Sequence, residues 1–300
     1  MKIIQMKGGL GNQMFQYSFF LVNKKFNNKV KLDITTYNNY YLHNGIELFK
    51  VFGIFEDDNI EDESIFDLKD NYIFFKLRKI VGLFFLNKNL FIKKTHFIEK
   101  SYSKFYENLF TESNLYLDGY WQNEKYFVNH RKLILEKYNW HSISEKNRKL
   151  ISEMEKVNSV SLHIRRYDRI KNIKDLFYLI KLILTYRTAP KSYYLDAIKF
   201  IKDNVNQPKF YVFTDNIEWV KKNIPTDDNY VIVNWNRGSD SNQDMCLMTK
   251  CKHNIISMST FSWWGAWLNK NKNKIVISPN KWAVRLEKDY GIIPESWIRM

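Results

Sequence analysis

The chain has 300 residues, of which 45% are hydrophobic and 17% aromatic, so it is long enough to bury a substantial core in one large domain or two medium ones. Its 47 Lys and Arg residues outnumber 32 Asp and Glu, and the formal charge of +15 favours partners that carry phosphate. The two cysteines, Cys246 and Cys251, are too few for a disulfide framework and indicate a reducing compartment.

No apolar run approaches the roughly 20 residues that span a bilayer. The N-terminus leads directly into a predicted strand, so we expect no signal peptide and a cytoplasmic protein. The segment 76–94 interleaves apolar and basic residues and allows two interpretations. In the first interpretation the segment docks on an anionic membrane, which would place the protein at the inner face of the membrane. In the second it is a domain helix whose lysines snorkel to solvent.

The first half of the sequence opens with the pattern of an α/β domain. Residues 3–6 predict a strand, a glycine-rich loop and a helix follow, and residues 29–34 predict a second strand. The apolar residues that share one stripe of this helix are Phe15, Phe19, Val22 and Phe26. The sequence pattern of residues 57–106 predicts no definite secondary structure. We interpret residues 115–127 as a packed loop and the start of a helix.

The second half alternates strands and helices after a charged helical connector at about 132–157. The predicted strands are one that ends at Ile164 and the segments 209–214, 231–235, 254–257 and 274–278. The predicted helices are 194–205, one headed by Asp215, 243–252 and 262–269. This alternation favours a mainly parallel sheet, so we predict an α/β fold with domains at 1–150 and 151–300.

Two adjacent arginines follow the strand that ends at Ile164. Arg165 and Arg166 carry many N–H donors and two fixed charges, which suit a diphosphate that leaves with growing negative charge. His163 would add a donor, and Asp168 would hold one arginine in its working rotamer. The alternative is an ordinary surface ion pair at a strand end.

The glycine-rich loop after the first strand is neither a P-loop nor a complete dinucleotide fingerprint. No Gly-Lys-Ser/Thr follows Gly9 and Gly11, and the third glycine position holds Met14. Bare amides at a helix N-terminus favour an anionic ligand. The alternative is a plain strand-to-helix turn with Asn12 as the N-cap.

Two further strand ends are candidate ligand sites. Residues 259–265 join a predicted strand to a helix whose dipole favours phosphate, although Ser259 or Thr260 could simply cap that helix. Asp215 follows a strand at the edge where open α/β sheets bind ligands. Asp215 also resembles the first residue of a capping box with Glu218, and the two roles are compatible.

No metal site is expected, and the tryptophans of the segment 259–268 allow two interpretations. The histidines lack ligand spacing, and Thr214-Asp215-Asn216 supplies a single carboxylate. For Trp263, Trp264 and Trp267 we predict a place in the core for at least two, with a sugar-stacking wall as the alternative.

Taken together, these segments resemble the bacterial α-1,2-fucosyltransferases, glycosyltransferase family eleven. The segments that match in the family's order are Gly8–Tyr17, Gly119–Gln122, His163–Asp168, Phe213–Asp215 with Ile217–Val220, and Ser259–Leu268. His163–Asp168 is similar to the HxRRxD motif shared with α-1,6- and protein O-fucosyltransferases. The chain departs from the family pattern at Tyr167, where the family has Gly, and at Met258, where it has Asn.

The resemblance implies a GT-B-like fold of two Rossmann-type domains that face a cleft, with the acceptor on the N-terminal side. It implies metal-independent, inverting transfer of fucose from GDP-β-L-fucose, a substrate rather than a cofactor, to O2 of a terminal galactose in a surface glycan. A related GDP-sugar transferase with another sugar or acceptor position is the alternative. Nucleic acid is a poor partner, because the charges are dispersed and no recognised motif occurs.

The resemblance also assigns roles to individual residues. Arg165 would hold the β-phosphate and supply the main catalytic charge, and Asp168 is a candidate base that we expect rather to orient an arginine. Asp215 would contact the nucleoside. The residues implied to bind the donor are Gly9, Gly11, Asn12, His163, Arg165, Arg166, Asp215, Thr260, Phe261 and Ser262.

Overall fold

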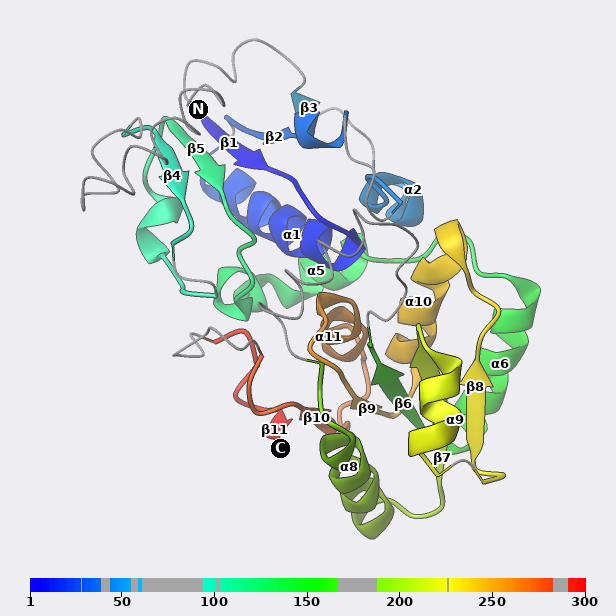
Figure 1. Cartoon of the computed structure of the whole chain (residues 1–300). Coiled ribbons are helices and arrows are strands. Elements are labelled where there is room, and N and C mark those ends of the chain that lie inside the picture. The colour runs from blue at the N-terminus through cyan, green and yellow to red at the C-terminus, as the bar shows by residue number, and fades with distance from the viewer. Residues whose placement is uncertain are drawn as a thin grey trace, which may run out of the picture. The chain divides into compact units, whose positions relative to one another are not determined.

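The computed structural model describes residues 1–27, 29–38, 44–54, 59–60, 94–100, 103–166, 188–225, 227–282 and 291–300. The chain divides into two compact units, Met1–Tyr138 and Asn139–Met300 (Figure 1). The predicted division at residue 150 would cut through helix α6 (Glu145–Lys156), which packs against α10 (Asn242–Lys250) of the second unit.

The first unit contains a five-stranded parallel sheet in the order β3-β2-β1-β5-β4. Its strands are β1 (Lys2–Gln5), β2 (Val30–Asp33), β3 (Asn59–Ile60), β4 (His96–Ile98) and β5 (Leu115–Asp118). Its helices are α1 (Leu10–Phe26), α2 (Leu48–Phe52) and α5 (Arg131–Lys137), with short 3₁₀ turns η1 (Thr35–Tyr37), η2 (Glu107–Phe110), η3 (Glu124–Tyr126) and η4 (Val128–His130). The predicted opening of strand, helix and strand is confirmed, whereas β3 and β4 were not predicted. The interpretation of 115–127 as a loop and helix start is wrong for its first residues, because Leu115–Asp118 pair with β1 and β4 as strand β5.

Helix α1 is the central helix of the first unit and is buried on most sides. Phe15, Phe19 and Val22 lie in the core, and Phe19 stacks on Trp121 with ring centroids 4.7 Å apart. Phe26 does not continue this stripe, because 62% of its surface is exposed at the end of the helix. The predicted helix is therefore confirmed through Phe26, but its buried stripe ends at Val22.

The second unit contains a six-stranded parallel sheet in the order β11-β10-β9-β6-β7-β8 (Figure 1). Its strands are β6 (Asn158–Ile164), β7 (Pro208–Thr214), β8 (Tyr230–Val233), β9 (His253–Ile255), β10 (Val276–Ser278) and β11 (Ile298–Arg299). Besides α6 and α10, its helices are α8 (Lys191–Asn204), α9 (Ile217–Asn223) and α11 (Thr260–Trp267), with the 3₁₀ turn η5 (Gly238–Ser241).

Counted from β6, this is the strand order 3-2-1-4-5-6 of dinucleotide-binding folds. Helices α8 and α9 share one buried cluster with β6, and α6 and α10 share another with β7, so both faces of the sheet are covered. The predicted class, α/β and GT-B-like with two parallel-sheet units in one chain, is confirmed; the second unit has the Rossmann-type strand order, whereas in the first unit β5 rather than β4 lies next to β1.

Strand β6 differs from the half-buried strand that its alternating sequence predicts. Its apolar residues pack into the cluster with α8, but its polar residues are buried as well. Ser161 Oγ accepts a hydrogen bond from Asn254 Nδ2 at 2.7 Å. A polar face can lie against a second helix layer when such bonds satisfy it.

The tryptophans of α11 form core contacts, as predicted. All three rings of Trp263, Trp264 and Trp267 are buried, and Trp263 donates from Nε1 to the carbonyl of Ile292 at 2.6 Å. In the described ranges, which leave out most of the basic segment 76–94, the structure holds no helix with the length and apolarity to cross a bilayer.

Candidate active site

The sequence motifs converge on one position in each sheet. In the second unit the strand order reverses between β6 and β9, and in the first unit it reverses between β1 and β5. Open α/β sheets bind ligands outside the carboxyl ends of the strands at such a reversal. The second unit brings Arg165 together with residues 257–262 there, and the first unit brings residues 7–12 together with residues 118–122.

Asp215 is the partner that joins the two arginines. Ile164 and Thr214 are register partners at the ends of β6 and β7, so the next residues of both strands meet. Asp215 Oδ1 accepts the backbone N–H of Arg166 at 2.9 Å, and Asp215 Oδ2 lies 3.4 Å from Arg165 Nε. Asp168, which we expected to orient an arginine, lies outside the described residues.

Asp215 does not cap helix α9, so that prediction is wrong. The cap is Asn216, whose Oδ1 accepts the backbone N–H of Trp219 at 2.8 Å. The physical reason is that the Asp215 carboxylate already faces the arginines of the neighbouring strand.

The two arginines have different surroundings. Arg165 keeps 36% of its side-chain surface exposed at the edge of the sheet. The guanidinium of Arg166 lies 4.4 Å from the centre of the Trp219 ring, and its Nη1 donates to the carbonyl of Ala189 at 3.3 Å. Arg165 therefore presents charge at the ligand-binding edge, while Arg166 packs against the neighbouring elements.

His163 lies behind the arginines. It is buried, and its Nδ1 is 2.7 Å from Ser257 Oγ in the loop after β9. Burial, together with the charge of Arg165, lowers the pKa of His163 to about 3. The imidazole is therefore neutral near pH 7 and braces the loop rather than adding a charge.

The loop between β9 and α11 presents polar groups at a helix N-terminus. Ser259 Oγ accepts the backbone N–H of Phe261 at 3.3 Å, which confirms the predicted cap. Ser262 is buried and donates to the Ser259 carbonyl at 3.3 Å, whereas Thr260 and Phe261 are partly exposed. Met258, which replaces a polar residue of the family pattern, packs against the core.

The glycine loop of the first unit begins with a tight turn. Gly8 has φ +84°, and a Cβ there would lie 2.5 Å from Asn12 Nδ2. Gly9 occupies the N-cap position of α1, so the predicted cap by Asn12 is wrong. Asn12 Oδ1 instead accepts a hydrogen bond from Gln122 Nε2 at 2.8 Å, which joins the two sequence motifs of this unit.

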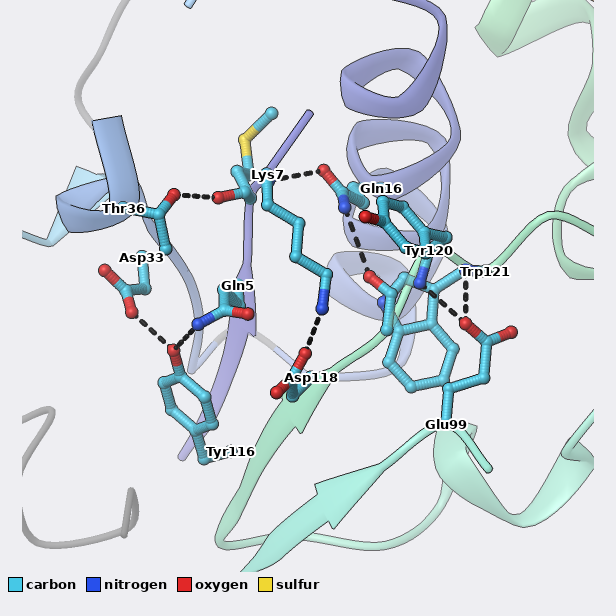
Figure 2. Close-up of polar contacts among 12 residues, drawn as sticks. Gln5, Lys7, Gln16, Asp33, Thr36, Glu99, Tyr116, Asp118, Tyr120 and Trp121 are labelled. Carbon is cyan, nitrogen blue, oxygen red and sulfur yellow. Dashed lines mark hydrogen bonds and ion pairs between the residues drawn. The ribbon is translucent and has the colours of Figure 1, made fainter. Parts of the chain in front are cut away.

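Gln16 joins the same two segments one helical turn further along α1. Its Oε1 accepts the backbone N–H of Lys7 at 3.0 Å, and its Nε2 donates to the carbonyl of Gly119 at 3.1 Å (Figure 2). Lys7 Nζ forms an ion pair with Asp118 across the two strand ends. Lys7 and Asp118 were not predicted as site residues, although both directly precede the glycines of motifs in the sequence.

Glu99 supports the turn that follows β5. Its Oε2 accepts the backbone N–H groups of Tyr120 at 2.6 Å and Trp121 at 3.3 Å (Figure 2). Trp121 has φ +56°, a conformation that costs free energy in a residue with a side chain. Burial raises the pKa of Glu99 to about 7, although these backbone bonds favour its charged form.

The edge of the second unit has the chemistry of a phosphate site. It offers a partly exposed guanidinium, a helix N-terminus and hydroxyl groups, which together complement a diphosphate. Within the part of the chain that the structure describes, no three His, Cys, Asp or Glu side chains gather as a metal site.

Comparison with known proteins agrees with this chemistry. Residues 1–300 match the profile of the family described as glycosyl transferase family 11. An alpha-1,2-colitosyltransferase of Escherichia coli is 35% identical over 99% of this chain and 98% of its own. The O-antigen biosynthesis glycosyltransferase WbnK of Escherichia coli is 31% identical over 98% and 99%. A galactoside 2-alpha-L-fucosyltransferase SEC1 of Bos taurus is 27% identical over 36% of this chain and 28% of its own.

Proposed function

Because the chain belongs to glycosyl transferase family 11, we propose that it moves L-fucose from GDP-β-L-fucose to O2 of a terminal galactose, with inversion at the transferred carbon. The observation that carries this proposal is the position of Arg165, partly exposed at the strand reversal of a Rossmann-type sheet and paired with Asp215. The acceptor that we propose is a surface glycan that ends in galactose.

The difficult step in such a reaction is departure of GDP from a sugar carbon that becomes positively charged. Negative charge then grows on the β-phosphate, and Arg165 is placed to stabilise it. Loss of one preorganised donor of this kind typically costs about 100- to 1000-fold in rate. The start of α11, with Thr260 and Phe261 partly exposed, would bind the same diphosphate through backbone amides.

His163, Arg166 and Ser262 would act mainly by holding this edge in shape. Each is engaged inside the second unit, with Ser257, with Trp219 and Ala189, and with the Ser259 carbonyl. Asp215 would orient Arg165 in addition to its proposed contact with the nucleoside. In the first unit, Gly9, Gly11 and Asn12 remain our candidates for donor contacts from the acceptor side.

A second donor is favoured by one comparison. The colitosyltransferase matches nearly the whole chain, whereas the fucosyltransferase named above matches about a third of it. Colitose is fucose without its 3-hydroxyl group. A site that hydrogen-bonds that hydroxyl would reject the deoxy sugar strongly, so donor preference separates the two candidates.

The test is transfer by the purified protein with GDP-fucose, GDP-colitose or GDP-mannose and a panel of galactosides. Because we propose a reaction without metal or cofactor, the assay contains EDTA. We expect an α-1,2 linkage to galactose, identified by NMR, with GDP-fucose as the best donor. Faster turnover with GDP-colitose than with GDP-fucose would show that colitose is the preferred sugar. A product linked at another position would refute O2 of galactose as the acceptor atom.

The variant Arg165→Ala tests the proposed role of Arg165 in the same assay. Arg148→Ala is its matched control, because Arg148 is an exposed arginine on α6 that donates to the Ile143 carbonyl. Activity should fall in the first variant and persist in the second. Equal activity of both would remove the central role given to Arg165.

A further inference from the structure

A charged pair and an aromatic ring lie at the strand reversal of the first unit. Lys7 follows β1, and Asp118 ends β5, the neighbouring strand in the sheet. Their side chains keep 27% and 21% of their surface exposed. Tyr120 is also partly exposed, with its ring centre 4.9 Å from Lys7 Nζ (Figure 2).

The surrounding residues hold these three groups in place. Gln16 bonds the backbone of Lys7 and the carbonyl of Gly119, and Glu99 accepts the backbone N–H of Tyr120. A site whose residues are fixed by such bonds binds a ligand without first ordering its side chains.

The Asp118 carboxylate stays ionised in this setting. His96 Nε2 lies 3.8 Å from Asp118 Oδ2, and Lys7 pairs with the other oxygen. Burial alone would raise the pKa of Asp118, but the contacts with His96 and Lys7 lower it to about 2. A carboxylate of this kind is a strong hydrogen-bond acceptor and a poor general base, so its chemistry is recognition of a donor group.

The composition of this cluster selects a neutral polyol over a phosphate. The charges of Lys7 and Asp118 cancel, and the carboxylate would repel the diphosphate that suits Arg165. A sugar instead offers hydroxyl hydrogens to the carboxylate, hydroxyl oxygens to the ammonium, and an apolar ring face to Tyr120.

We propose that Lys7, Asp118 and Tyr120 form the subsite for the terminal sugar of the acceptor, with Asp118 accepting a hydrogen bond from a sugar hydroxyl and Tyr120 covering the ring. The ligand class is a neutral hexose at the end of a glycan. This assignment deepens the proposed function and rests on it for the reaction, but the sugar-binding step can be measured without turnover.

The test uses two variants and a matched control in the full chain. Asp118→Asn keeps the size of the side chain and removes its charge, and Tyr120→Leu keeps the backbone N–H that Glu99 accepts. Asp203→Asn is the control, because it breaks an ion pair of a lysine and an aspartate on the outer helix α8. Thermal unfolding of each variant checks that it folds.

Two readouts separate acceptor from donor. We expect KM for the galactoside to rise by about 10-fold or more in each test variant, as expected when a charged hydrogen bond or an apolar contact to a sugar is lost. KM for the GDP-sugar and affinity for GDP should stay within about twofold of the parent, and the control should change neither. In saturation-transfer NMR with GDP present, methyl β-galactoside should bind the parent and lose its signal in Asp118→Asn.

Each contrary outcome has its own meaning. An unchanged galactoside KM in two folded variants overturns the subsite and leaves the proposed function standing. A raised GDP-sugar KM in place of the galactoside KM also overturns it, because the cluster would then serve the donor. If the parent transfers no GDP-sugar, the proposed function fails, and the NMR signal alone decides: its loss in Asp118→Asn supports a sugar site, and its absence in the parent refutes one.

Discussion

Asp215 contacts both arginines that follow β6, accepting the N–H of Arg166 at 2.9 Å through Oδ1 and lying 3.4 Å from Arg165 Nε through Oδ2. The contact exists because β6 and β7 end in register, at Ile164 and Thr214. One carboxylate thereby fixes the backbone of Arg166 and the side chain of Arg165. The direction in which the Arg165 guanidinium points is therefore set by Asp215, which follows the neighbouring strand β7.

The first prediction separates these two contacts. Asp215→Asn keeps an oxygen for the Arg166 N–H but loses the charge that faces Arg165. We expect kcat to fall by about 10- to 100-fold, less than the about 100- to 1000-fold expected for Arg165→Ala, since the guanidinium stays present but is less well directed. Steady-state kinetics and unfolding curves of the two variants test this order. A larger loss in Asp215→Asn than in Arg165→Ala, in folded proteins, would contradict it.

The second unit could be predicted closely from the sequence. Most of its strands are short alternating or apolar segments separated by helices, so they show in a local window, and the loops that follow β6, β7 and β9 were placed correctly. The two-residue strand β11 was not predicted. The partners of individual side chains could not be predicted. The pairing of Arg165 with Asp215 depends on strand register, and the buried polar face of β6 depends on the helix layer above it.

The first unit was predictable only at its start. Strand β5 has four residues without clear alternation, and β4 has three, so neither gives a periodic signal. Lys7, Asp118 and Glu99 are distant in sequence and meet only because β1, β5 and β4 are adjacent in the sheet. Asn12 matched the pattern of a cap, but its bond to Gln122 is a tertiary contact that local sequence does not encode.

The second prediction concerns acid stability of the second unit. The pKa of His163 is about 3 in the folded protein against 6.5 for an ordinary histidine, so the unfolded chain takes up the proton first as pH falls. The free energy of unfolding should therefore fall below pH 6.5, by at most about 1.4 kcal/mol per pH unit. His163→Asn should lack this component. Urea unfolding of both proteins between pH 7 and pH 4.5 measures it, and parallel pH profiles would show that His163 is not held neutral.

The third prediction concerns the first unit, where the free energy of unfolding should fall as pH rises rather than as pH falls. The pKa of Glu99 is about 7 in the fold against 4.5 ordinarily, because burial disfavours its charge. Its contribution to stability is fully present below pH 4.5 and is lost as pH rises to about 7, by at most about 1.4 kcal/mol per unit. Glu99→Gln should remove this loss, so its stability relative to the parent should improve from pH 5 to pH 7. A constant difference across that range would exclude the raised pKa.

The fourth prediction tests the packing of α11, the helix that follows the β9–α11 loop. A Cβ at Gly265 of α11 would lie 2.8 Å from Cβ and 3.0 Å from Sδ of Met248 on α10. Gly265→Ala should therefore lower the free energy of unfolding by about 1–3 kcal/mol, although alanine in a helix ordinarily adds about 1 kcal/mol.

Met248→Ala provides the matched test of that cause. Alone it should cost about 2–5 kcal/mol through the cavity that it leaves. Combined with Gly265→Ala, it removes Met248 Sδ and Cγ, which the new methyl group would meet, but keeps Cβ at 2.8 Å, so the overlap is relieved in part and the double variant should be more stable than the sum of the single losses by up to about 1 kcal/mol. Strict additivity in a double-mutant cycle of urea unfolding would show that the cost of Gly265→Ala does not come from Met248 Sδ and Cγ.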